Sequence, residues 1–358
     1  GTGLVHSAPG CGPEDFEACR KYKIPPFNNL DEEGNYPEDM GEMSELNAKA
    51  DSKAFIELLK RENALIEKSP VEHEYAHCWR CHNPVIFRLT TQWFFKVEDL
   101  IEEMRELNKK VFWQPDWGGK KQFDSWIANL RDNSITKQRY WGVPLPIWQG
   151  SKCKDYIVIS SVEEMAKHSI NGFVPGDLHK PYIDEVEMKC KCGEVMYRNP
   201  DILDVWIDAG SASWNCLDFP RQTELFEKYF PADFIIEGKD QIRGWFNLLM
   251  VASALAFDRP AFKNVSMHGF ITDVEGEKMS KSLGNIISPF EIVDKHGADT
   301  LRYYSIDITI GDDMSFSWDE IGLKYKNLLI LWNLHNFLID FKVNNNLRLV
   351  HNPVLGDE

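Results

Sequence analysis

The sequence has no run of 18 apolar residues, the length that a helix needs to cross a membrane, so we expect no membrane-spanning segment. It also has no internal repeat and no low-complexity segment. It begins Gly-Thr-Gly-Leu, without an initiator methionine and without the pattern of a signal peptide. Basic residues are scarce, since 40 Lys and Arg stand against 56 Asp and Glu, a net charge of −16. This charge argues against nonspecific nucleic-acid binding over the whole surface and leaves room for local basic patches.

The cysteines lack the spaced framework of a small secreted protein. Eight are present, mostly in close pairs, in a chain of 358 residues that is long enough for two or three domains and an ample core. This pattern indicates reduced thiols in a cytoplasmic setting, with metal binding as one use for the pairs.

One stretch, residues 265–285, combines a strand, a turn and a basic loop. Val265 to Phe270 is apolar and predicts a buried strand, and a turn is expected at Asp273 to Gly276. Lys-Met-Ser-Lys-Ser follows at residues 278–282. Its two lysines, three residues apart among small hydroxyl residues, suit an anion site that closes on a triphosphate. The alternative for such a loop is a solvated basic turn without a ligand.

A second stretch predicts a ligand-binding turn between a strand and a helix. Asp233-Phe234-Ile235-Ile236 predicts a short buried strand, and a helix is expected to run to about Phe257. Between them stands Glu-Gly-Lys-Asp-Gln-Ile-Arg-Gly-Trp at residues 237–245. Doubly wound α/β folds bind ligands at turns of this kind, and acidic and amide groups suit ribose hydroxyls and an ammonium group. The alternative is simple helix capping by Asp240.

Together the two stretches resemble the class I aminoacyl-tRNA synthetases, and the similarity extends along nearly the whole chain, most strongly to the isoleucine branch. The resemblance implies an α/β fold, the C-terminal half of a Rossmann-type catalytic domain, with remnants of a β-rich editing insertion and the start of an α-helical bundle. It implies activation of isoleucine with ATP and Mg²⁺ and transfer to tRNA(Ile). The family's other signature, His-Ile-Gly-His, is absent from these 358 residues, so the chain resembles an internal fragment of a larger enzyme that is a monomer.

The resemblance also assigns roles to residues of the two stretches. The loop residues Lys278, Ser280, Lys281 and Ser282 would act in catalysis. Gly238 and Asp240 would hold the ribose of the adenylate, and the backbone of His268, Gly269, Phe270 and Ile271 would lie against the adenine. Glu237 and Gln241 would face the amino acid, whose side chain Trp206 and Trp245 would enclose.

The same resemblance predicts six segments. Residues 1–75 would be the C-terminal part of an editing insertion, 76–150 a zinc-knuckle-like segment and the entry to the catalytic domain, and 151–200 a small second insertion. Residues 201–297 would form the Rossmann-type catalytic half with the Lys-Met-Ser-Lys-Ser loop, 298–317 a connecting module against the tRNA, and 318–358 the first helix of the anticodon-binding bundle. In the first segment, His6 and Asp15 would line the pocket that hydrolyses misattached valine, with Asp15 on the amino group of the amino acid. Without the family, a turn followed by a helix-capping acid explains the same residues.

Two cysteine groups are candidate zinc ligands. Cys78 and Cys81 have the spacing of a zinc knuckle, but four ligands are needed and no second pair stands nearby, which makes them a half-site. Cys153, Cys190 and Cys192 form the other group, where relatives that bind zinc have a further cysteine at the position of Gly150. His168 or a water would then complete the site. The alternative is three cysteines without metal.

Three other functions remain compatible with the sequence: a fragment of a valyl- or leucyl-tRNA synthetase, or a noncatalytic tRNA- or ATP-binding module derived from a synthetase. The residues His77-Cys78-Trp79-Arg80-Cys81 and Gly12-Pro13-Glu14-Asp15 favour the isoleucine branch.

Overall fold

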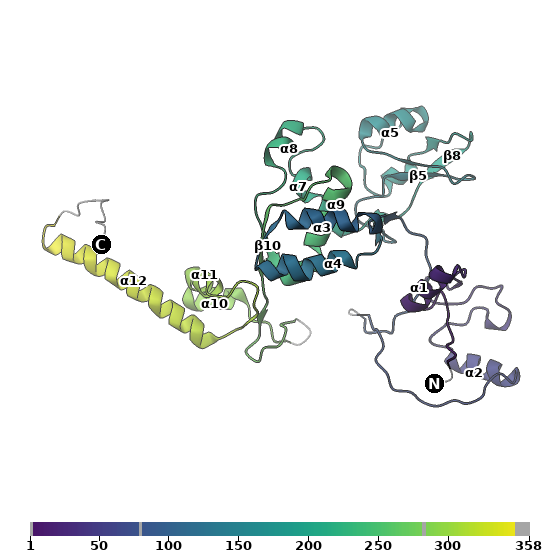
Figure 1. Ribbon diagram of the computed structural model, residues 1–358, viewed down its shortest axis with the longest axis horizontal. Coiled ribbons are helices and arrows are strands. Elements are labelled where there is room, and N and C mark those ends of the chain that lie inside the picture. The colour runs from purple at the N-terminus through teal and green to yellow at the C-terminus, as the bar shows by residue number, and fades with distance from the viewer. Residues whose placement is uncertain (1–2, 79–80, 281–283, 348–358) are drawn as a thin grey trace. The chain divides into compact units, whose positions relative to one another are not determined.

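The computed structural model describes residues 3–78, 81–280 and 284–347, and the chain divides into two compact units, residues 1–92 and 93–358 (Figure 1). No helix of the described residues is long and apolar enough to cross a membrane.

The first unit consists of short helices joined by irregular segments. They are α1 (Pro13–Tyr22), the 3₁₀ helix η1 (Gly41–Met43) and α2 (Ser52–Arg61). Helix α1 begins with proline at its first position and ends at Lys23, whose φ of 57° is left-handed. Helix α2 ends at Arg61 because Asn63 has a φ of 54°, which no α-helix continues. The described part of this unit contains two isolated β-bridges and no longer strand.

A three-stranded parallel sheet is the centre of the second unit. Its order is β10 (Ile235–Gly238), β11 (Asn264–His268) and β2 (Phe112–Gln114). Helix α9 (Trp245–Phe257) connects β10 to β11, and every residue from Phe246 to Ala254 is buried, as expected for a helix that is apolar on all sides. The sheet and helices share a core that includes Trp113, Phe123, Phe246, Phe262 and Met267. The predicted α/β class is therefore confirmed.

Shorter elements surround this core. Before and after β2 come β1 (Phe94–Phe95), η2 (Glu98–Leu100), α3 (Ile101–Lys109), the π-helical turn η3 (Gly118–Phe123), α4 (Asp124–Ala128), β3 (Asn133–Ser134) and β4 (Thr136–Lys137). Before β10 come β9 (Ile202–Leu203), α6 (Val205–Gly210), α7 (Ala212–Asn215) and α8 (Thr223–Tyr229). Strand β1 pairs with β3 and β4 pairs with β9, both antiparallel.

A small antiparallel sheet combines residues 147–150 with strands from the segment 151–200 that the sequence marks as an insertion. Its order is β6 (Tyr156–Val158), β5 (Ile147–Gly150), β8 (Val195–Arg198) and β7 (Met188–Lys189), accompanied by α5 (Val162–His168), η4 (Ile170–Gly172) and η5 (Tyr182–Glu185). Helix α5 is capped by Ser161, whose Oγ accepts a hydrogen bond from the Glu164 N–H at 3.1 Å. This sheet has its own core around Trp148, Val186 and Met188.

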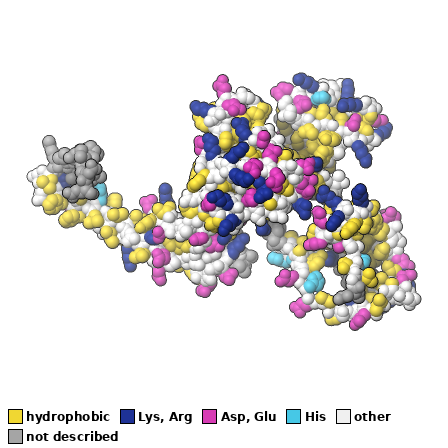
Figure 2. Space-filling model, in the orientation of Figure 1, with side chains coloured by type: hydrophobic (Ala, Val, Ile, Leu, Met, Phe, Trp, Pro, Cys, Tyr) yellow, Lys and Arg dark blue, Asp and Glu magenta, His cyan; other side chains and the backbone are white. Residues whose placement is uncertain are grey.

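The end of the described chain is helical. Helix α10 (Pro289–His296) stops at Gly297, as expected, and α11 (Ala298–Ile306) follows. Strand β12 (Ile271–Thr272) pairs with β13 (Met314–Ser315), which leads into α12 (Trp318–Asn344), and Ser317 caps that helix. Large apolar side chains are exposed along α12, among them Leu331, Trp332 and Phe337, and Figure 2 shows hydrophobic side chains gathered over it.

Candidate functional site

The carboxyl ends of β10 and β11 bring the predicted ribose residues together. The parallel register pairs Gly238 with His268, so both strands end at the same edge of the sheet. A Cβ atom placed on Gly238 would lie 2.7 Å from Asp240 Oδ1 and 3.4 Å from His268 Cε1. Asp240 is exposed, and Glu237 folds back so that its carboxylate accepts the Gly238 N–H at 3.2 Å. At this edge the Asp240 carboxylate can therefore accept hydrogen bonds from a ligand. Gly238 beside it has no side chain that would keep the ligand away from the backbone.

Gln241 links this edge to the two tryptophans. Its amide nitrogen donates to Asp240 Oδ2 at 2.9 Å, and its amide oxygen accepts the Trp245 N–H at 2.9 Å. Trp245 Nε1 donates to the Ala209 carbonyl oxygen in α6 at 3.0 Å. A Cβ atom on Gly244 would lie 3.2 Å from the Trp206 ring. The residues expected to face the amino acid are thus neighbours of those expected to face the ribose.

Helix α6, which carries Trp206, is fixed by a buried carboxylate. Asp204 is 7% exposed, and its Oδ1 accepts the Trp206 N–H at 2.9 Å, which caps the helix. Its Oδ2 pairs with Lys137 Nζ at 2.6 Å. Sequence reasoning gave Asp204 no role. The pair positions Trp206 from a strand far away in the sequence.

A second pair that sequence reasoning missed joins Lys239 to Asp313. Lys239 lies between Gly238 and Asp240, and its Nζ is 2.7 Å from Asp313 Oδ2. The other carboxylate oxygen of Asp313 accepts the Phe270 N–H at 2.7 Å. The ammonium of Lys239, followed by the Phe270 N–H, lowers the pKa of Asp313 below its ordinary value. No local sequence pattern indicates this contact, because the partners are 74 residues apart.

A hollow of about 850 Å³ adjoins the same edge and shares Asp240 and Phe270 with it. Lys121, Lys239 and Arg243 line it, and the Arg243 guanidinium lies 5.3 Å from the centre of the Trp126 ring. Basic groups beside aromatic rings suit an anionic, planar ligand.

The loop that follows β12 is closed by Asp273 and Asn285. Asn285 Nδ2 donates to Asp273 Oδ2 at 2.8 Å and to the Lys278 carbonyl oxygen at 3.2 Å, and its Oδ1 accepts the Ser280 N–H at 2.9 Å. Lys278 is exposed and Ser280 is half-buried. Lys281 and Ser282, the other two predicted loop residues, lie outside the described residues.

Comparison with known proteins identifies the family. The family model described as tRNA synthetases class I (I, L, M and V) matches residues 26–317. The chain belongs to this family. It is 44% identical to the isoleucine--tRNA ligase of Methanopyrus kandleri and 43% identical to that of Methanothermobacter marburgensis, each match covering 94% of this chain. These matches cover 33% and 32% of the two relatives, so the chain spans about a third of their length.

The comparison with solved structures gives a partial alignment. A leucyl-tRNA synthetase of Agrobacterium radiobacter, crystallised as a ternary complex with tRNA, aligns with a TM-score of 0.44 and 28% identity. The alignment covers 59% of this chain and 29% of that one.

In this synthetase chain the predicted editing residues lie near the start of α1. Asp15 is in the first turn, where a carboxylate suits the helix dipole, and its Oδ1 accepts a hydrogen bond from Ser7 Oγ at 2.8 Å. His6 is exposed, and no contact between it and Asp15 is recorded in the described part of the chain. The editing assignment stays a prediction.

The predicted trio of cysteines is brought together. Cys153, Cys190 and Cys192 place their sulfurs 3.2 to 3.5 Å apart, although Cys153 comes from the turn after β5 and the others from the turn before β8. Tetrahedral zinc with bonds of about 2.3 Å needs sulfurs about 3.8 Å apart, so a slight opening would fit the ion. His168 is not part of the cluster as described. The fourth corner faces Gly150, where a Cβ atom would lie 2.5 Å from Cys153 Sγ and 3.3 Å from Cys190 Sγ.

Cys78 and Cys81, the other candidate pair, are not part of a larger ligand group. The His82 N–H donates to the Cys78 carbonyl oxygen at 2.8 Å, and His77 pairs with Pro84 in an isolated bridge. Among the described residues, no third His, Cys, Asp or Glu joins these two cysteines as a ligand group. The half-site stays a prediction.

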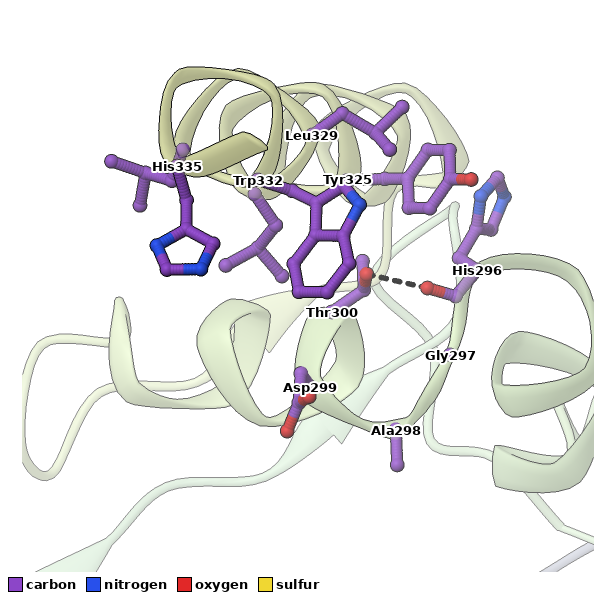
Figure 3. Close-up of a pocket in the computed structure, with 11 residues that line it drawn as sticks. His296, Gly297, Ala298, Asp299, Thr300, Tyr325, Leu329, Trp332 and His335 are labelled. Atoms are coloured by element: carbon purple, nitrogen blue, oxygen red, sulfur yellow. Dashed lines mark hydrogen bonds between the residues drawn. The ribbon is translucent and has the colours of Figure 1, made fainter. Parts of the chain in front are cut away.

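A separate hollow of about 440 Å³ lies between α12 and the start of α11 (Figure 3). Trp332 of α12 points toward Thr300, whose Oγ1 donates to the His296 carbonyl oxygen at 2.6 Å. This hollow shares no residue with the edge of the parallel sheet, and its lining mixes leucines and Trp332 with His296, Asp299 and His335.

Proposed function

We propose that this chain is the part of an isoleucine--tRNA ligase that carries the second half of its catalytic domain. The longer enzyme would activate isoleucine with ATP and Mg²⁺ and transfer it to tRNA(Ile). The observation that carries the proposal is the cluster of Gly238, Asp240, Gln241 and His268 at one sheet edge, in a chain more than 40% identical to ligases of this name.

Each group at this edge has a task that suits its chemistry. The exposed Asp240 carboxylate accepts hydrogen bonds from ribose hydroxyls, and Gly238 lets the sugar approach the backbone. The rings of Trp206 and Trp245 offer an apolar surface to a branched side chain, and Gln241 orients the amino acid between them and the ribose. The six segments predicted from the sequence remain our proposal for how the longer chain is divided.

The loop lysines would act on the phosphates. When the isoleucine carboxylate attacks the α-phosphorus, negative charge grows on the phosphoryl oxygens and on the departing pyrophosphate. The ammonium groups of Lys278 and Lys281 stabilise that charge more than they stabilise bound ATP, which accelerates the reaction.

We further propose that His6 and Asp15 belong to a pocket that hydrolyses misattached valine. Such a pocket is needed because one methylene group gives only about 1–3 kcal/mol of discrimination between isoleucine and valine. Zinc at Cys153, Cys190 and Cys192 would hold the small antiparallel sheet together and take no part in the reaction.

Pyrophosphate exchange in the full-length protein tests the function. We expect exchange that depends on isoleucine, with weak exchange for valine and none for leucine. Stronger exchange with valine or leucine would identify a sister synthetase. A folded full-length protein without exchange for any amino acid would identify a noncatalytic module. The isolated 358-residue chain should show no exchange, since it lacks the His-Ile-Gly-His signature.

A further inference from the structure

The carboxylate of Asp313 contacts two segments of the candidate nucleotide site at once. One oxygen pairs with Lys239 Nζ at 2.7 Å, and the other accepts the Phe270 N–H at 2.7 Å. Lys239 is the residue between Gly238 and Asp240, and Phe270 follows two residues after His268. Asp313 itself belongs to the segment that leads through β13 into α12.

The backbone around Asp313 is packed directly against the turn after β11. A Cβ atom on Gly269 would lie only 2.0 Å from the Asp312 carbonyl oxygen, so the contact requires glycine at this position. The Met314 N–H donates to the Phe270 carbonyl oxygen at 2.9 Å, and the Phe316 N–H donates to that of Thr272 at 3.1 Å. The two contacts of the Asp313 carboxylate therefore begin a continuous pairing between the segment that contains Asp313 and the segment that follows β11.

The charge on Lys239 makes this contact important for a nucleotide. Lys239 directly precedes Asp240 in the sequence, and the Asp240 carboxylate is exposed and available to ribose hydroxyls. Asp313 holds that ammonium toward Phe270, whose ring centre lies 5.3 Å away. Without Asp313, the flexible lysine could pair with Asp240 and occupy the acceptor that the ribose needs.

We propose that Asp313 is a positioning residue for the nucleotide: it fixes the spacing between the Gly238–Asp240 turn and the Phe270 backbone, and it keeps Lys239 away from Asp240. This proposal rests on the proposed function, because it assumes that ATP binds at this edge. Asp313 touches no substrate and acts through its two partners.

A second lysine–aspartate pair provides a matched control. Lys263 Nζ lies 2.7 Å from Asp233 Oδ1, the same separation, and both residues are exposed. They stand just before β11 and β10, at the amino end of the sheet, away from the candidate site. Exposed pairs of this kind add little to global stability, so neither pair should matter much for folding.

The experiment measures pyrophosphate exchange in the full-length protein at varied ATP and isoleucine. We expect Asp313→Ala to lower kcat/KM for ATP by about 10- to 100-fold, the loss typical of a misplacement of up to about 1 Å, with KM for isoleucine changed less than about 2-fold. Asp313→Asn should lose less, because its amide oxygen still accepts the Phe270 N–H. Asp233→Ala should equal wild type.

A double variant separates positioning from a merely structural role. Lys239→Met removes the ammonium that would block Asp240. The double variant Asp313→Ala with Lys239→Met should therefore regain part of the kcat/KM for ATP that Asp313→Ala loses. Equal kcat/KM values for ATP in Asp313→Ala and Asp233→Ala would overturn the role of Asp313. An equal loss of kcat/KM for ATP and for isoleucine that the double variant does not recover would also overturn it. A wild-type protein without any exchange would instead overturn the proposed function.

Discussion

Asn285 donates a hydrogen bond to Asp273 Oδ2 over 2.8 Å and thereby joins the two ends of the lysine-containing loop. Asp273 also accepts the N–H groups of Glu275 at 3.0 Å and Glu277 at 2.7 Å, while Asn285 holds the backbone at Lys278 and Ser280. Two short polar side chains therefore fix the start of the loop.

The first prediction concerns this closure. The Asn285 amide, followed by the backbone N–H of Glu277, lowers the pKa of Asp273 below its ordinary value of 3.8. Because its pKa is lowered in the folded protein, ionised Asp273 stabilises the fold. This stabilisation is complete above pH 3.8 and is lost as the pH falls through the lowered pKa. Asn285→Ala should move the pKa of Asp273 back up, which an NMR titration of its carboxyl carbon measures. An unchanged titration would show that the two side chains do not interact.

The same variant should affect activity through loop order. We expect Asn285→Ala to lower kcat for exchange by about 10-fold, since the ammonium groups would be less well positioned in the transition state. Asn264→Ala, in which the lost side chain lies at the amino end of β11, is the control and should retain activity.

The second prediction concerns the lysines themselves. Lys281→Ala should slow adenylate formation by roughly 100-fold or more, and Lys278→Ala should act in the same direction, as in other losses of a single electrostatic contact in a transition state. The effect should appear in kcat, with isoleucine affinity nearly unchanged. Lys295→Ala removes an exposed lysine of α10, paired with Glu291 at 2.7 Å, and should be silent. A near-wild-type rate for Lys281→Ala at saturating ATP and isoleucine would refute the mechanism.

The third prediction follows from the buried cap of α6. Asp204→Ala removes the acceptor of the Trp206 N–H and the partner of Lys137, which should cost about 0.5–2 kcal/mol of stability. Because Trp206 moves with the helix, KM for isoleucine should rise more than KM for ATP. Asp204→Asn keeps an oxygen for the cap and should retain most of the stability, which urea unfolding measures. Equal changes in both KM values would mean that α6 does not shape the amino-acid side of the site.

Local signals in the sequence predicted local structure well. Ser161 and Ser317 cap their helices, and Gly297 ends α10, because each of these contacts spans only a few residues. Strand ends were less accurate: the strand expected at 265–270 spans 264–268, since the backbone of Gly269 turns to meet Asp312.

Contacts between distant segments could not be predicted from the residues alone. Neither Lys239 with Asp313 nor Lys137 with Asp204 has a sequence spacing that indicates contact, and a charged residue has many equally plausible partners before the fold is known. The cluster of Cys153, Cys190 and Cys192 was predicted, but only through the family resemblance, since spacing does not show which turns meet.

The fourth prediction concerns editing. In the full-length protein, Asp15→Ala should leave isoleucine-dependent exchange intact and allow valyl-tRNA to accumulate, because the amino group of the misattached valine loses its partner. Glu17→Ala, an exposed acid further along α1, is the control and should keep deacylation. Unchanged deacylation in Asp15→Ala would remove that residue from the pocket. The isolated 358-residue chain should not hydrolyse valyl-tRNA, since its resemblance to the family implies that it holds only the C-terminal part of the editing insertion.

The last prediction concerns zinc. The purified chain should carry at most one zinc ion, held by Cys153, Cys190 and Cys192, and Cys190→Ser should abolish it. Hydrogen bonds from the neighbouring thiols and burial raise the pKa of Cys190 to about 11, although the backbone N–H of Cys192 opposes the shift, so the Cys190 thiol holds a proton that the ion must displace. Affinity should therefore rise steeply with pH. Gly150→Cys places a fourth sulfur at the open corner. Its Cβ atom would lie 2.5 Å from Cys153 Sγ, the end of a side chain that can rotate, and 3.3 Å from both the Cys153 carbonyl oxygen and Cys190 Sγ. Since closed structural sites use four protein ligands, Gly150→Cys should bind zinc more tightly in a competition with a chromogenic chelator.

Two tightly bound zinc ions in the unmodified chain, measured by elemental analysis, would contradict the assignment because they would require Cys78 and Cys81 to bind metal as well.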